Sequence, residues 1–151
     1  MPRILVAIDG SEASDRAAAF VDRFFAGMDV AITAVNVARN PGRTVLPVPY
    51  GGVHPWPPPM EPTGERSALQ EAMAREEAAA TAVAAEHAPA DADVEVVFGE
   101  AVEAISRAAE DENADLIVVG SGDIGFVQRL LGSSVADRLA HEAPRPVLIV
   151  R

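Results

Sequence analysis

Short apolar runs alternate along this chain with segments that are amphipathic or rich in alanine. The runs are dominated by Val, Ile and Leu, and they span 3–8, 30–38, 93–98, 115–119 and 146–150. Continuous apolar runs of this length are typical of strands that are buried on both faces of a parallel sheet. The pattern therefore predicts five strands.

The segment after the first run has the period of an amphipathic helix. Its apolar residues recur three or four positions apart, and the predicted core face consists of Ala17, Phe20, Val21, Phe24 and Phe25. Ser11 or Ser14 is the expected N-cap, and Gly27 is the expected end.

Three further helices are predicted. The alanine-rich segment 65–87 is one, and the third precedes the last run. The second is 102–110, with Val102, Ile105 and Ala109 on its inward face. Strands that alternate with helices at these lengths form a parallel sheet with helices on both faces. We therefore predict an α/β fold, a Rossmann-like three-layer sandwich around a five-stranded parallel sheet, in a single domain over 1–151.

The segment 40–64 interrupts this alternation. It holds eight of the twelve prolines, the single Trp56 and the single Tyr50, and no helix or strand of useful length fits it. A loop this long is rarely an idle connection. A lid over a binding crevice, a contact with a partner subunit and simple disorder are the alternatives.

Composition indicates a globular protein, since 49% of the residues are hydrophobic. No apolar run reaches the roughly 18 residues that a membrane span needs, and we expect no secretory signal at the first residues. The absence of cysteine is typical of a cytoplasmic protein. We therefore expect a cytoplasmic location without membrane attachment.

The formal net charge of −11 makes both nucleic acid and anionic membrane unsuitable partners. All twelve basic residues are arginine. Without lysine, neither a P-loop nor Schiff-base chemistry is available. His54, His87 and His141 have no metal-ligand spacing, so we predict neither a metal site nor a catalytic residue.

Several residues follow the carboxyl ends of the predicted strands. Asp9 follows the first strand, Val37 lies near the end of the second, and Gly120 follows the fourth. Ligands of open parallel sheets bind at this edge. We therefore expect these residues to surround one crevice, although Asp9 also fits the role of a turn or cap residue.

The whole chain resembles the universal stress protein family. The matching segments are ILVAIDGS at the first strand, Val37, VVFGEAVEAI before the third helix, ADLIVVGS at the fourth strand and APRPVLIV at the last. The resemblance implies a strand order of 3-2-1-4-5 and a homodimer that pairs through the strand at 146–151. It also implies a site for ATP or AMP that is formed by Ala7, Asp9, Val37, Val119, Gly120, Gly122, Gly132, Ser133, Ser134 and Val135.

The phosphate loop departs from the family pattern, which is G-x-x-G, nine residues, then G-[ST]. An ungapped register keeps Gly120 but places Asp123 and Ser133 at the next two glycine positions. A deletion of one residue instead aligns Gly122 and Gly132, followed by Ser133. Glycines let the backbone approach phosphate closely, whereas Asp123 would repel it unless a magnesium ion bridged the two.

The resemblance implies that the chain is a stress-response protein. It would bind an adenine nucleotide as a sensor or switch and act with an unknown signalling protein. The alternative is a nucleotide-free dimeric adaptor whose phosphate loop has degenerated. A weak ATPase is the third hypothesis.

Overall fold

The computed structural model of the protein describes residues 1–41, 63–121 and 135–151, and only the backbone of 63–66. The described strands are β1 (Arg3–Ala7), β2 (Ala31–Ala38), β3 (Asp93–Phe98), β4 (Leu116–Gly120) and β5 (Val147–Val150). The described helices are α1 (Glu12–Phe24), α2 (Thr63–His87), α3 (Ala101–Asp111) and α5 (Val135–Glu142). The hypothetical lid over 40–64 lies almost wholly outside the described residues.

The five strands form one parallel sheet in the order β3-β2-β1-β4-β5. The central strand β1 lies between β2 and β4, so that Leu5 is opposite both Thr33 and Ile117. This confirms the predicted fold class and strand order. The order reverses between β1 and β4, and at such a point the loops at the carboxyl ends diverge and leave a crevice.

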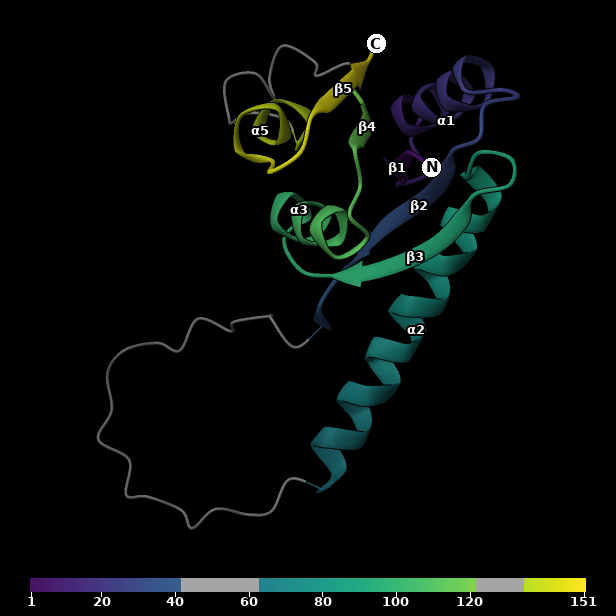
Figure 1. Cartoon of the computed structure of the whole chain (residues 1–151). Helices are drawn as coiled ribbons and strands as arrows, with labels where there is room; N and C mark the ends of the chain where they lie inside the picture. The colour runs from purple at the N-terminus through teal and green to yellow at the C-terminus, as the bar shows by residue number, and fades with distance from the viewer. Residues whose placement is uncertain (42–62, 122–134) are drawn as a thin grey trace.

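Helices cover both faces of the sheet (Figure 1). Alternate strand residues enter different cores, because successive side chains of a strand point to opposite faces. Leu5 belongs to the cluster that α3 and α5 complete, whereas Ile4 and Val6 belong to the cluster that α1 completes. Helix α2 packs over β2 and β3 and buries Ala80 and Ala84.

Helix α1 buries Ala17 and Val21 as its period predicts, but the prediction for Phe24 is wrong. Phe24 is 57% exposed and stacks on Phe20 with a ring-centroid distance of 5.1 Å. The helix ends at Phe24, and the C-cap Phe25 packs against the α1 side of the core instead. The last helical residue of the predicted apolar face is therefore exposed.

Helix α2 is the longest element and begins at Thr63, two positions before the predicted start. No residue in the described stretch 67–79 is buried, and Figure 1 shows this part of the helix extending past the strands. Alanine stabilises such a helix through its high intrinsic propensity without requiring a buried face. No helix in the described part of the chain is long and apolar enough to cross a membrane.

Strands β3 and β5 are the two edges of the sheet. Ile117 and Ser121 donate their backbone N–H groups to the carbonyls of Pro146 and Val150, respectively. Because main-chain groups alternate in direction along a strand, the N–H groups of Val147 and Ile149 point away from β4. Within the described parts of the chain, the outer side of β5 therefore presents unpaired main-chain donors.

Candidate functional site

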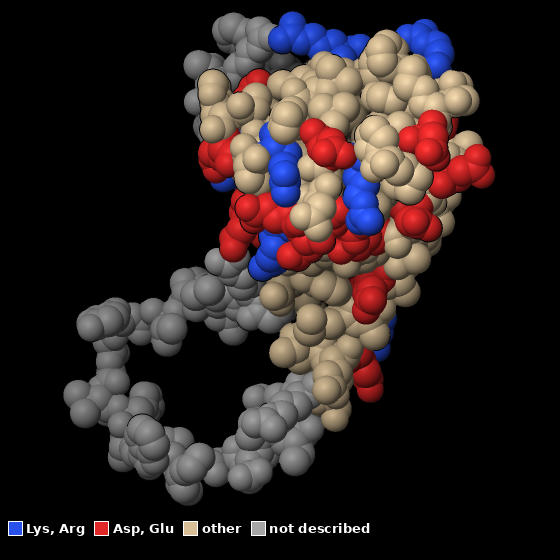
Figure 2. Space-filling model, in the orientation of Figure 1, with Lys and Arg blue, Asp and Glu red and all other residues tan. Residues whose placement is uncertain are grey.

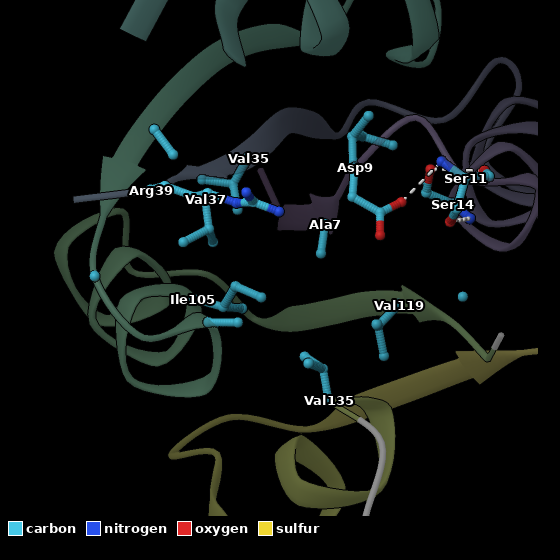
Figure 3. A pocket seen from close by; sticks show the side chains of 15 residues that line it. Ala7, Asp9, Ser11, Ser14, Val35, Val37, Arg39, Ile105, Val119 and Val135 are labelled. Carbon is cyan, nitrogen blue, oxygen red and sulfur yellow. Dashed lines mark hydrogen bonds between the residues drawn. The ribbon is translucent and has the colours of Figure 1, made fainter. Parts of the chain in front are cut away.

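A cavity of about 340 Å³ opens at the carboxyl ends of β1, β2 and β4 (Figure 3). We call it the site cavity. Its described lining consists of Ala7, Ile8, Asp9, Ser11, Ser14, Val35, Val37, Ala38, Arg39, Gly99, Ala101, Ile105, Val119, Gly120 and Val135. The volume lies within the range of roughly 300–1,000 Å³ that is usual for small-molecule sites.

The structure brings together every predicted site residue that it describes. Ala7, Asp9, Val37, Val119, Gly120 and Val135 all line the site cavity, although they come from four separate elements and one turn. The remaining four predicted residues, Gly122, Gly132, Ser133 and Ser134, lie outside the described residues. The part of the site that the resemblance assigns to phosphate is therefore a sequence-based prediction alone.

The turn between β1 and α1 supplies the polar end of the cavity. Gly10 has a φ of +77°, which glycine adopts without strain, and the chain reverses there. Ser11 then serves as the N-cap of α1, because its Oγ accepts a hydrogen bond from the Ser14 N–H at 3.2 Å. This settles the N-cap alternative in favour of Ser11.

The Asp9 carboxylate faces the cavity and is held by the same turn (Figure 3). Its Oδ1 accepts a hydrogen bond from the Ser11 N–H at 2.9 Å. Burial alone would raise the pKa of Asp9, but hydrogen bonds from Ser11 and Ser14 outweigh it and lower the pKa below its ordinary value. Asp9 is thus an ionised acceptor at neutral pH, so its structural role in the turn is compatible with a role toward a ligand.

Gly120 allows α1 to pack directly against the end of β4. A Cβ atom at this position would overlap the carbonyl group of Ala13 and lie 2.9 Å from the Ser14 nitrogen. The helix N-terminus therefore reaches the cavity only because residue 120 has no side chain. Gly120 has a packing reason that is independent of phosphate binding.

The other end of the cavity is mainly apolar. Val35 and Val37 from β2 face Ile105 from α3, and Gly99 and Ala101 add backbone and a small side chain. Arg39, the residue after β2, extends past Val37 toward the middle of the cavity (Figure 3). The cavity thus combines a carboxylate end with an apolar end that has one guanidinium at its mouth.

The sequence patterns did not mark Ser14, Ile105 and Arg39 as site residues. Ser14 and Ile105 were interpreted through their helices, as a cap candidate and a core position. Arg39 lies one position beyond a strand, which is the same signal that marked Asp9 and Gly120. If every residue directly after a predicted strand had been considered, Arg39 would also have been identified.

No group of three or more metal-ligating side chains occurs within the described ranges. His87, at the end of α2, instead lies with its Nδ1 2.7 Å from the Asp15 Oδ1 and joins α2 to α1. Its side chain is 27% exposed, so it is a partly buried contact rather than the free surface histidine that its sequence position suggests.

The comparisons with known proteins agree on one family. The model of the universal stress protein family matches residues 1–151. The chain is 35% identical over 152 residues to a Thermus aquaticus protein named "Universal stress protein in QAH/OAS sulfhydrylase 3'region", covering 98% of this chain and 97% of that protein. It is 29% identical over 161 residues to stress response protein NhaX of Bacillus subtilis (strain 168), covering 99% and 97%.

Among solved structures, the fold is similar to that of a universal stress protein in complex with cAMP. The TM-score is 0.57 at 25% sequence identity, and the match covers 99% of this chain and 96% of that one.

Proposed function

This chain belongs to the universal stress protein family, and from that premise we propose that it binds an adenine nucleotide, ATP or AMP, in the site cavity. The observation that carries the proposal is the cavity itself. The family resemblance names Asp9, Val37 and Gly120 as ligand residues, and these residues line one hollow at the crevice end of the sheet. The similar structure that contains cAMP supports the same class of ligand.

The chemistry of the lining fits a nucleoside. The apolar surfaces of Val37 and Ile105 suit the faces of a purine ring, and the Asp9 carboxylate is an acceptor for hydroxyl groups such as those of a ribose. We place the phosphates toward α5, whose first residue Val135 lines the cavity, because amide groups at a helix N-terminus attract anions. Gly122, Gly132, Ser133 and Ser134 complete this proposed site, with magnesium as a bridging ion if Asp123 lies near the phosphates.

We assign the bound protein the role of a sensor or switch in a cytoplasmic stress response that acts on a signalling protein of unknown identity. The nucleotide-free adaptor and the weak ATPase are the competing hypotheses. They differ in a measurable way, since an adaptor binds no nucleotide and an ATPase releases ADP.

We also propose a homodimer through the outer side of β5, in the segment 146–151. The main-chain donors of Val147 and Ile149 support it, since they are unpaired within the described residues and an apolar edge strand is a template for pairing with a second chain. A symmetric pair of copies is also the commonest assembly of soluble proteins.

The test compares the unfolding of nucleotide-stripped protein with and without ATP or AMP in the presence of magnesium. A nucleotide at 100 times its dissociation constant should add about 2.7 kcal/mol to the free energy of unfolding. Asp9→Asn removes an ionised acceptor, so we expect affinity to fall on the order of 10-fold or more. Asp29→Asn is the matched control, because Asp29 is exposed and lies before β2, at the opposite end of the sheet.

An unchanged melting temperature with every adenine nucleotide would overturn the proposal in favour of the adaptor. Equal affinity of Asp9→Asn and the wild type would instead remove Asp9 from the site while leaving nucleotide binding intact.

A further inference from the structure

Arg39 provides the one positively charged side chain among the described residues of the site cavity. The residue is exposed, and within 1–41, 63–121 and 135–151 no hydrogen bond or ion pair involves its side chain. Arg138 in the same ranges, by contrast, pairs with both Glu100 and Glu142. A guanidinium that lines a cavity and has no partner among the described residues is available to a ligand.

The surroundings of Arg39 suit a flat ring. Ala38 pairs with Phe98 across β2 and β3, so Arg39 and Gly99 are the next residues beyond the two strand ends. Gly99 has a φ of +144°, a conformation that favours glycine, and therefore this position carries no side chain. Gly99, Val37 and Ile105 thus form an apolar part of the cavity that Arg39 also lines.

The charged groups of the cavity bear on whether Arg39 contacts the purine ring or a phosphate of the nucleotide. The second charged group of the described lining is the Asp9 carboxylate, on the side of the turn before α1 (Figure 3). The labelled side chains beside Arg39 in Figure 3 are Val35 and Val37, and apolar neighbours favour contact with a purine face over contact with a phosphate. A guanidinium is planar and weakly hydrated, and it stacks well on aromatic rings.

We infer that Arg39 stacks on the face of the bound purine and acts as the base-selecting residue of the site. The inference rests on the proposed function, and it goes beyond it by naming the part of the ligand that Arg39 contacts. A stacked cation gains more from the larger purine than from a pyrimidine. Arg39 should therefore increase the preference for adenosine over cytidine.

The experiment is calorimetric titration of the wild type, Arg39→Ala and Arg23→Ala with adenosine, AMP, ATP and cytidine. Arg23 is an exposed arginine in the last turn of α1 and serves as the matched control. We expect Arg39→Ala to reduce the affinities for adenosine, AMP and ATP by the same factor, about 3- to 30-fold. We also expect it to reduce the preference for adenosine over cytidine, whereas Arg23→Ala leaves all affinities unchanged.

Each other outcome has a distinct meaning. Weaker binding of AMP and ATP with unchanged binding of adenosine would overturn the inference, because Arg39 would then contact phosphate. Unchanged affinities in Arg39→Ala would overturn it while leaving the proposed function intact. If the wild type binds none of the adenine compounds, the proposed function fails and the inference fails with it. Equal melting temperatures of the three unliganded proteins would exclude a folding defect as the cause of any difference.

Discussion

Glu95 on β3 has a carboxylate oxygen that is buried without a hydrogen-bond partner in the described part of the chain. Burial raises the pKa of this carboxyl, and the negative charges of Glu112 and Asp111 raise it further. Because the pKa is higher in the folded than in the unfolded protein, the folded state binds more protons. Stability is therefore lost as the pH rises from the unfolded pKa through the folded one.

The substitution Glu95→Gln removes this charge. We expect it to increase the free energy of unfolding at pH 7 by on the order of 0.5–1 kcal/mol, a value kept small because the side chain retains some contact with solvent. Thermal unfolding at several pH values would measure the effect. The gain over the wild type should shrink as the pH falls below the pKa of Glu95.

Glu86→Gln is the control for this prediction, since Glu86 is exposed on α2. An equal gain in both variants would mean that the lower net charge, rather than the local environment of Glu95, is responsible.

Some features of the site could be predicted from the sequence, and others depend on elements that are distant in the sequence. Asp9, Val37 and Gly120 follow from one rule, that side chains at the carboxyl ends of parallel strands converge. The packing reason for Gly120 could not be predicted, because it depends on where the Ala13 carbonyl of another element lies. Ile105 was predicted as a core residue and also lines the cavity, since a position at the end of a core borders the hollow beside it.

At the scale of elements, the first turn of helix α1 contributes both to the stability of the fold and to the pKa of Asp9 in the site. Ser11 caps the helix and also donates its N–H to Asp9. The hydrogen bonds of Ser11 and Ser14 keep the pKa of Asp9 lowered against the effect of burial. A lowered pKa means that ionised Asp9 stabilises the folded state above the unfolded pKa, and this contribution is lost as the pH falls through the folded pKa.

We expect Ser11→Ala to reduce the free energy of unfolding by about 1 kcal/mol through loss of the cap. The same change should raise the pKa of Asp9, because the serine hydroxyl no longer interacts with the carboxylate. Thermal unfolding and an NMR titration of the Asp9 carboxyl carbon would measure the two effects. Ser11→Asn, which retains a capping oxygen, should recover most of the stability.

If Ser11→Ala shifts the pKa of Asp9 but leaves stability unchanged, Ser11 is not an effective cap. The opposite result would show that the Ser11 N–H and Ser14, rather than the Ser11 hydroxyl, lower the pKa of Asp9.

The strands and helices could be predicted closely because each pattern is local. The structure differs from the prediction at the ends of elements, where the local pattern is weakest. Phe24 satisfies the helical period, yet it is the last residue of α1 and is 57% exposed. Thr63 begins α2 two positions early, because Thr63 and Gly64 carry no apolar helical period in the sequence.

At the scale of the whole molecule, the strand order could not be obtained from hydrophobic periodicity, which is the same for any arrangement of five buried strands. It followed from the family resemblance. Charge adds information that periodicity lacks. Figure 2 shows acidic side chains gathered over the face formed by β3 and α3, where the sequence places Asp93, Glu95, Glu103, Glu110 and Asp111.

The two sheet edges therefore differ in their suitability for pairing. Two copies joined through β3 would bring the acidic residues Asp93 and Glu95 of both copies into one interface, which is unfavourable. The segment Val147–Val150 carries no charge, and its outer N–H groups have no main-chain partner among the described residues. This contrast is the reason to expect the homodimer at β5.

The substitution Ile149→Pro tests this expectation at a single main-chain group. It removes an N–H that points away from β4, so the hydrogen bonds between β4 and β5 remain, and proline is tolerated at such an edge position. We expect the wild type to sediment with about twice the chain mass of 15.8 kDa and Ile149→Pro to sediment as a monomer. Ile149→Ala loses a side chain of the core but keeps the N–H group, and it should remain a dimer. Monomers in both variants would attribute the dimer to side-chain packing, whereas a dimeric Ile149→Pro would place the interface elsewhere on the molecule.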